Sequence, residues 1–244
     1  CMSKKVINQN TNYDSELLNS IDSNFIFDEN PINRLNNTTD NLEKGNSFDE
    51  TDKEKELKEL RLQINSINDC NLKDNSKKIV LGNGNINSPI MLVGEAPGAD
   101  EDNAGQTFLG EVGDLLKKML NAINIKKEDI YTTYAVNFRP PEDRKPTTAE
   151  IKRYSQFLQK QISIIKPKII ILMGSTAMES LTGLKSKISM ERGKWKEIIV
   201  KNTNYKVIIT FNPSYLLRVP ENKKHSWEDL KKIKQKITDL KLNI

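Results

Sequence analysis

Short apolar segments that end in glycine or proline alternate along this chain with segments whose apolar residues have helical spacing. The predicted strands are Lys77–Gly82, Ser88–Gly98, Asp129–Val136, Lys168–Gly174 and Lys206–Phe211. The predicted helices are Leu109–Ile123, Thr147–Ile165, Ser175–Leu181 and Ser226–Leu242. Strands that alternate with helices form a mainly parallel sheet, because each helix carries the chain back to the edge where the previous strand began. We therefore expect an α/β fold whose sheet is covered by helices on both faces.

The N-terminal region differs in composition from the rest of the chain. Residues 1–49 are rich in Asn, Asp and Ser and lack a sustained period of either 2 or 3.6, which predicts a disordered or loosely ordered leader. The next segment, Thr51–Ile67, places these apolar residues at helical spacing: Leu57, Leu60, Ile64 and Ile67. We expect an amphipathic helix there, packed on a main domain that spans residues 50–244.

Charge is divided unevenly along the chain. Residues 1–60 carry 13 acidic and 7 basic side chains, a net charge of −6, and because the whole chain is +5, residues 61–244 carry +11. A basic domain suits a polyanionic partner such as nucleic acid. The alternative is that lysine, which far outnumbers arginine, simply keeps the surface soluble.

Composition excludes several kinds of protein and site. No apolar run reaches the roughly 18 residues of a spanning helix, and the first residues lack the pattern of a secretory signal. We therefore expect a cytoplasmic protein without a membrane partner, and a monomer. Two cysteines and one histidine, His225, are too few for a disulfide framework, a four-thiolate zinc site or a self-contained iron–sulfur site, so we expect no metal.

Residues that could bind a ligand or take part in catalysis follow four of the predicted strands. They are Gly94–Gly98, Tyr134–Arg139, Gly174 and Asn212–Arg218. In parallel sheets, ligands bind beyond the carboxyl ends of the strands. The motif GEAPGADED, Gly94–Asp102, combines a turn that exposes backbone N–H groups with several carboxylates. Such a carboxylate can orient water or stabilise positive charge, although a solvated acidic loop is the alternative interpretation.

Several segments, taken in order, resemble the type-4 uracil-DNA glycosylases. They are IMLVGEAPGADED, GQTFLGEVGDLLKKML, IYTTYAVNFRPPEDRKPT, KPKIIILMG, RGKW, TFNPSYLLR and KKHSWEDL, and the resemblance covers Cys70–Leu240. It implies a three-layer α/β/α sandwich with a central, mainly parallel sheet. It also implies a base-excision repair enzyme whose partner is DNA containing uracil. Such an enzyme flips uracil out of the helix and hydrolyses its N-glycosidic bond.

The resemblance also implies roles for individual residues. The carboxylates available to orient water are, in order of preference, Glu101, Glu95 and Asp102. Groups expected to contact the flipped base are the backbone at Gly94, Glu95 and Ala96, the stacking ring of Phe108, and the side chains of Tyr134 and Asn212. DNA contacts are expected from Ser214, from Leu216 and Leu217 as an apolar wedge, and from Arg139, Arg144 and Arg218 at phosphates.

Three departures from the family pattern modify these expectations. The positions of the family's four cluster cysteines are Ile67, Cys70, Phe138 and Tyr154, so we predict that apolar and aromatic packing replaces the iron–sulfur cluster. Asn212 stands where the family has a catalytic histidine, and it can still donate a hydrogen bond to the departing base. Tyr134 replaces an asparagine that reads uracil. Three interpretations therefore stay open: an active uracil glycosylase, a glycosylase redirected to another damaged base, and a relative that binds DNA but is catalytically impaired.

Overall fold

A mostly parallel sheet lies at the centre of the computed structural model, which describes residues 50–68 and 70–244. The predicted acidic leader, residues 1–49, lies outside the described residues. In spatial order the six strands are β1 (Asn83–Gly84), β3 (Tyr131–Tyr134), β2 (Ile90–Gly94), β4 (Ile169–Met173), β6 (Thr203–Thr210) and β5 (Trp195–Val200). Strands β3, β2, β4 and β6 run parallel, whereas β1 and β5 pair antiparallel at the two edges. The predicted mainly parallel sheet is therefore confirmed.

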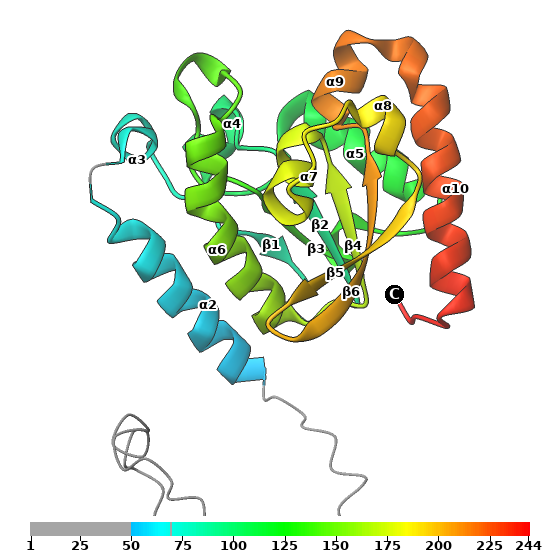
Figure 1. Cartoon of the computed structure of the whole chain (residues 1–244), viewed down its shortest axis with the longest axis horizontal. Coiled ribbons are helices and arrows are strands. Elements are labelled where there is room, and N and C mark those ends of the chain that lie inside the picture. The colour runs from blue at the N-terminus through cyan, green and yellow to red at the C-terminus, as the bar shows by residue number, and fades with distance from the viewer. Residues whose placement is uncertain (1–49, 69) are drawn as a thin grey trace, which may run out of the picture. The chain divides into compact units, whose positions relative to one another are not determined.

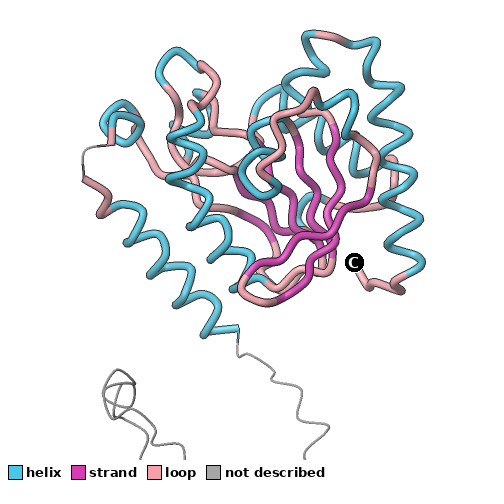
Figure 2. The backbone as a smooth tube through the Cα atoms, viewed as in Figure 1, coloured by secondary structure: helices cyan, strands magenta, loops and turns pink. Residues whose placement is uncertain are grey.

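Two helical layers cover the sheet (Figures 1 and 2). On one face lie α2 (Glu50–Asn65), α6 (Thr148–Ile165) and α7 (Ser175–Thr182), and on the other lie α5 (Gly110–Asn121), α9 (Pro213–Arg218) and α10 (Lys223–Asp239). Shorter helices are α3 (Asn71–Asn75), α4 (Ala99–Ala104), α8 (Ile188–Glu191) and the 3₁₀ turns Lys127–Asp129, Pro141–Asp143 and Pro220–Asn222. The expected three-layer α/β/α sandwich is thus confirmed.

The central strands explain why the chain forms layers. All five residues of β2 and all five of β4 are buried, as expected for strands covered on both faces. Successive side chains point to opposite faces, so Ile170 packs with Leu60 of α2 in one core, and Ile171 packs with Leu230 of α10 in the other. Each apolar run of the sequence therefore builds two cores at once.

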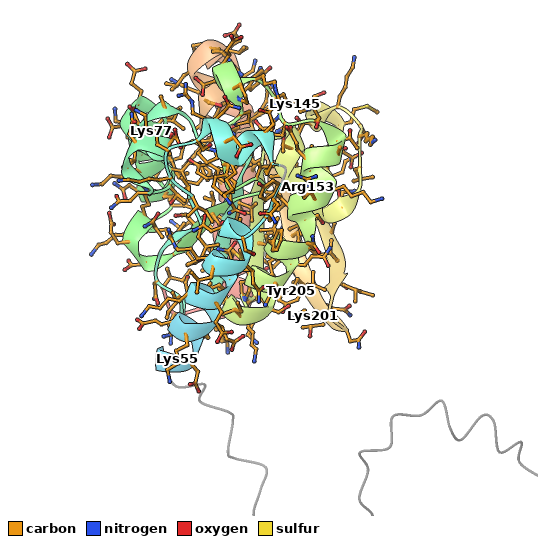
Figure 3. All side chains as sticks on the ribbon, turned by 90° about the vertical axis from the view of Figure 1, so that its left-hand side faces the viewer. Lys55, Lys77, Lys145, Arg153, Lys201 and Tyr205 are labelled. Atoms are coloured by element: carbon orange, nitrogen blue, oxygen red, sulfur yellow. The ribbon has the colours of Figure 1, made fainter. Side chains whose placement is uncertain are left out.

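Charged side chains cover the outside of these layers. Lys55, Lys77 and Lys145 are exposed on the side of the molecule that carries α2 and α6 (Figure 3). For α2, which carries Lys55, the helical spacing predicts this exposure, since its apolar residues face the core and its charged residues face water. Within residues 50–68 and 70–244, no helix is both long enough and apolar enough to cross a membrane.

One strand prediction was wrong, and one strand was missed. Lys77–Gly82 is a largely irregular segment, and the strand that follows it, β1, has only two residues. The segment is nevertheless tied to the domain, because Val80 N donates to Asn137 O at 2.9 Å and Asn137 Nδ2 donates to Val80 O at 3.0 Å. Strand β5 was missed, since it lies at an edge and its half-exposed, lysine-containing sequence lacks a continuous apolar run.

Candidate active site

Residues from separate motifs meet where the parallel strands end. Strand β3 ends at Tyr134 and its neighbour β2 at Gly94, while Gly174 follows β4 and Asn212 lies two residues beyond β6. Because these strands are adjacent and parallel, the loops after them share one edge of the sheet. The structure thus brings together the strand-end residues that the sequence analysis identified.

Glu95 is held in place by contacts on both of its carboxylate oxygens. Its Oε1 accepts from Thr176 N at 2.9 Å and from Ser175 Oγ at 3.2 Å, both in the first turn of α7. Its Oε2 accepts from Asn212 Nδ2 at 3.1 Å. A Cβ atom on Gly174 would overlap the Glu95 carboxyl carbon, and Gly174 has a φ of +102°, so this position requires glycine. The negative charge lies at a helix N-terminus, which favours it.

The Asn212 amide has one fixed orientation. Asn212 is the N-cap of α9, and its Oδ1 accepts from Ser214 N at 3.1 Å. The cap therefore directs Nδ2 toward Glu95. The Asn212 side chain is buried, with 7% of the residue exposed. An amide NH₂ group has two N–H donors. One serves Glu95, and the second can serve a ligand at the same edge.

The other two candidate carboxylates bind the protein's own backbone. Glu101 Oε2 accepts from Gly98 N at 3.0 Å, and Oε1 accepts from Leu109 N at 2.8 Å, which ties together the two ends of the loop that contains α4. Asp102 Oδ1 accepts from the backbone N–H groups of Lys77 at 2.9 Å and Lys78 at 3.2 Å. Both carboxylates are at most 5% exposed. The geometry therefore favours Glu95, the second choice from sequence, as the carboxylate that faces a substrate.

Phe108 and Tyr134 form a buried aromatic pair. Their ring centroids are 4.9 Å apart with a tilt of 37°, and Phe108 N donates to Tyr134 Oη at 2.9 Å. Burial is the main reason that the pKa of Tyr134 lies well above its usual value, and the nearby Glu101 carboxylate raises the pKa further. The phenol is therefore neutral. The Phe108 ring, which was predicted to stack on a flipped base, packs on Tyr134 in this structure.

Lys127 supports this loop and was not predicted from the sequence. Its Nζ donates to Thr107 O at 2.8 Å and to Phe108 O at 2.7 Å. Phe108 has a φ of +51°, a left-handed conformation that is uncommon for an aromatic residue, and the lysine contact helps to hold it. Burial lowers the pKa of Lys127. No sequence signal distinguishes this lysine from the many solvated ones, because its partners are backbone oxygens about 20 residues away.

Comparison with known proteins identifies the family of this site. Residues 81–231 match the uracil DNA glycosylase superfamily. A type-4 uracil-DNA glycosylase of Archaeoglobus fulgidus is 34% identical over 181 residues, which cover 72% of this chain and 91% of the relative. That of Thermotoga maritima is 39% identical over 168 residues, 68% of this chain and 86% of the relative. The chain belongs to the type-4 uracil-DNA glycosylase family. The resemblance seen in the motifs is thus confirmed.

The two leucines predicted to form an apolar wedge differ in exposure. Leu216 is fully buried in the core beneath α9, whereas Leu217 is partly exposed and Arg218 is exposed. A buried side chain cannot enter a base step without leaving its core, so the wedge prediction rests on Leu217. Ser214 is partly exposed beside it.

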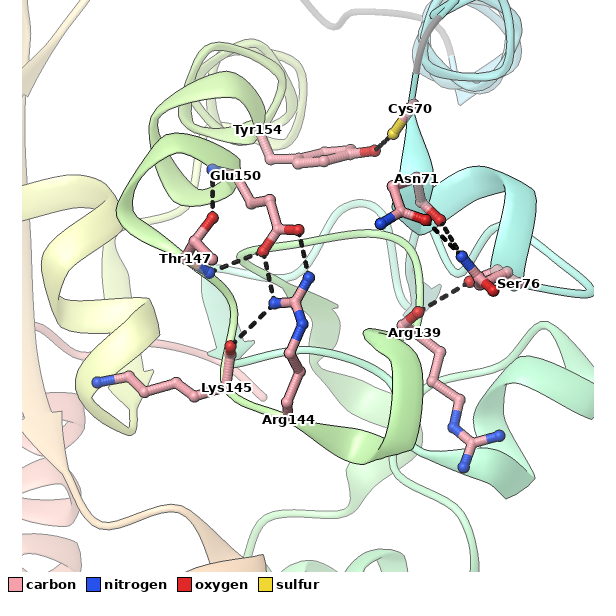
Figure 4. A network of polar contacts seen from close by, with 10 residues as sticks. Cys70, Asn71, Ser76, Arg139, Arg144, Lys145, Thr147, Glu150 and Tyr154 are labelled. Atoms are coloured by element: carbon pink, nitrogen blue, oxygen red, sulfur yellow. Dashed lines mark hydrogen bonds and ion pairs between the residues drawn. The ribbon is translucent and has the colours of Figure 1, made fainter.

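The other two predicted phosphate-binding arginines are already paired with carboxylates. Arg139 Nε lies 2.7 Å from Asp143, and Arg144 Nη2 lies 2.7 Å from Glu150. These guanidinium groups hold the pKa of both carboxyls below their usual values. Glu150 also belongs to the capping box at the start of α6, so Arg144 is part of a local network (Figure 4). A DNA phosphate would have to compete with these carboxylates.

The four positions of the family's cluster ligands come together but do not suit a cluster. Cys70 Sγ contacts Tyr154 Oη (Figure 4), at a distance of 3.2 Å. The ring centroids of Phe138 and Tyr154 are 6.2 Å apart with an edge-on angle of 74°. Ile67 packs against the same core. An iron–sulfur cluster needs about four thiolates, and this set offers one, engaged by a phenol. Within the described residues, no group of three or more His, Cys, Asp or Glu side chains could hold a metal ion.

Proposed function

We propose that this chain is a DNA repair glycosylase that flips uracil out of DNA and hydrolyses its N-glycosidic bond. The observation that carries the proposal is the pairing of Glu95 Oε2 with Asn212 Nδ2 at 3.1 Å, where the parallel strands end. The identity to type-4 uracil-DNA glycosylases over two thirds or more of the chain supports it. The Glu95 carboxylate can orient the water and stabilise charge on the sugar, and the Asn212 amide can donate a hydrogen bond to the base.

In the proposed reaction, the bond between the sugar C1′ and the base N1 breaks and water adds to C1′. The Glu95 carboxylate orients the water, stabilises the positive charge on the sugar and accepts the proton that the water releases. The base leaves as an anion, and the free N–H of Asn212 donates to its developing negative charge before solvent protonates it. Since Oε1 of Glu95 is fixed on α7, the carboxylate keeps its position through the reaction.

Excision of uracil from oligonucleotides tests this function. The substrates are end-labelled strands with one uracil, either single-stranded or paired with G or A, and strands with thymine or hypoxanthine are the controls. We expect release of uracil and retention of thymine. Release of hypoxanthine alone would favour the redirected enzyme that the Tyr134 substitution left open. DNA binding without release of any base would favour a relative that has lost catalysis.

Replacing Arg218 with glutamine should weaken DNA binding about equally for all sequences. Arg218 is exposed at the end of α9, next to the proposed wedge Leu217, so it is placed to neutralise a phosphate. The slope of log K against log salt should fall by about one unit. The measurement is fluorescence anisotropy over a salt series. Arg144→Gln is the matched control, with a smaller change because Glu150 already neutralises this arginine. Equal effects of the two variants would contradict the assignment.

We also propose that the chain works without an iron–sulfur cluster. The contact of Cys70 with Tyr154 and the edge-on packing of Phe138 support aromatic packing as the replacement. Protein purified without oxygen should contain iron and acid-labile sulfide far below one equivalent per chain, and Cys70→Ser should excise uracil at the rate of the unmodified protein. Stoichiometric iron that disappears in Cys70→Ser would overturn the proposal. A cytoplasmic location and a monomeric state stay predictions from the sequence.

A further inference from the structure

Two aromatic rings fill the space beside the end of β2. Gly94 is the last residue of β2, and a Cβ atom there would lie 2.7 Å from both Phe108 Cζ and Tyr134 Cδ1. Both rings therefore rest directly on the glycine backbone. Phe108 is 1% exposed and Tyr134 is 4% exposed, so neither ring offers an open face to a planar ligand. Yet this space adjoins Glu95, which follows Gly94 in the chain and holds Asn212.

The phenol of Tyr134 makes the contacts that a pyrimidine base could make in the same space. Its six-membered ring packs on Phe108, and its oxygen accepts from Phe108 N at 2.9 Å, as an exocyclic carbonyl oxygen would. Because its ring fills this space and its oxygen accepts from Phe108 N, Tyr134 leaves no room for a base while it stays there.

We propose that Tyr134 is a resident occupant of the base site, which a flipped pyrimidine must displace, and that it thereby sets the substrate range of the enzyme. This inference rests on the proposed function and deepens it. When Tyr134 turns away, the Phe108 N–H group needs a new acceptor, and a carbonyl oxygen of the base supplies one. The vacated space has the size of one six-membered ring. It therefore admits uracil and excludes purines such as hypoxanthine.

Removing the phenol should therefore accelerate excision. If the state in which Tyr134 has left the base site is populated at about 0.1–10%, the apparent affinity for the base is about 10- to 1,000-fold lower than that of an open site. A variant without the phenol has an open site and does not lose this affinity. Tyr134→Ala and Tyr134→Asn should raise the rate of uracil release at subsaturating enzyme by about tenfold or more. Free uracil should stabilise both variants against heat far more than it stabilises the unmodified protein. Tyr134→Phe keeps the ring in place and should show no such gain.

Two independent readouts separate this inference from the proposed chemistry. The rate of uracil release depends on both the base site and the chemical step, whereas thermal stabilisation by free uracil depends only on the base site. If no variant releases uracil but Tyr134→Ala binds it, the resident-occupant inference stands and the proposed reaction is wrong. If Tyr134→Ala and Tyr134→Asn both unfold cooperatively, yet neither binds uracil better nor releases it faster, the inference is overturned. Equal gains in Tyr134→Phe would also overturn it, because they would assign the effect to the hydroxyl instead of the ring.

Discussion

Uracil release should slow by about 10²- to 10⁴-fold when Glu95 is replaced by glutamine, because the proposed water-orienting group then lacks a negative charge. Glutamine keeps the shape of the side chain, and its carbonyl oxygen can still accept from Thr176 N. Its NH₂ group would then face Asn212 Nδ2, so that two donors oppose each other. Single-turnover release from a uracil oligonucleotide measures the chemical step, and anisotropy on the same oligonucleotide should show DNA binding within a few-fold of normal.

Glu101→Gln is the matched control for this prediction. Both oxygens of Glu101 accept backbone N–H groups, from Gly98 and Leu109, whereas the single side-chain oxygen of a glutamine can accept from only one of them. Leaving one buried donor without an acceptor costs about 1–3 kcal/mol, so the variant should unfold at lower temperature or denaturant concentration. Its folded fraction should retain most of the activity. A stable Glu101→Gln protein that has lost the chemistry, beside an active Glu95→Gln protein, would restore the order of preference suggested by the sequence.

The sequence predicts the centre of this fold better than its edges. The run Ile169–Met173 is apolar throughout, as expected for a short strand such as β4 that is covered on both faces. Strand β5 has water on one side and one neighbour, so Lys196 and Glu197 fit it as well as they fit a loop. Whether a strand lies at an edge depends on the order of the strands in the sheet, which local composition does not encode.

The same limit applies to the active site. Topology explains why Glu95 and Asn212 could be grouped before the structure was known, since the ends of adjacent parallel strands must meet. The choice between Glu95 and Glu101 could not be made, because both lie in one motif and differ only in the partners that the fold gives them. Leu216 was misjudged for a related reason. Neighbouring leucines on a short helix point in different directions, and only packing shows which one faces the core.

Replacing Asn212 should separate its two roles, donor and helix cap. Asn212→Ala removes both, so uracil release should fall about 10²- to 10³-fold and stability should fall by about 0.5–2 kcal/mol. Asn212→Asp keeps an oxygen that can accept from Ser214 N, so the cap should survive, and so should the stability at acidic pH, where the pair with Glu95 binds a proton, while release at neutral pH falls by a similar factor. Thermal unfolding and single-turnover release, measured on both variants, test the two roles separately.

The Asn212→Asp variant should also acquire a pH dependence of its own. Its new carboxyl would lie close to Glu95 Oε2, which the amide nitrogen now contacts at 3.1 Å. Two carboxylates at that distance raise the pKa of one of them, so a proton is bound as the pH falls. The protonated carboxyl regains an O–H donor, and the residual rate should therefore rise toward acidic pH relative to that of Asn212→Ala. If the release rates of the two variants have parallel pH profiles, position 212 donates no hydrogen bond to the leaving base. The proposal that Glu95 acts on the water and Asn212 on the base would then be wrong.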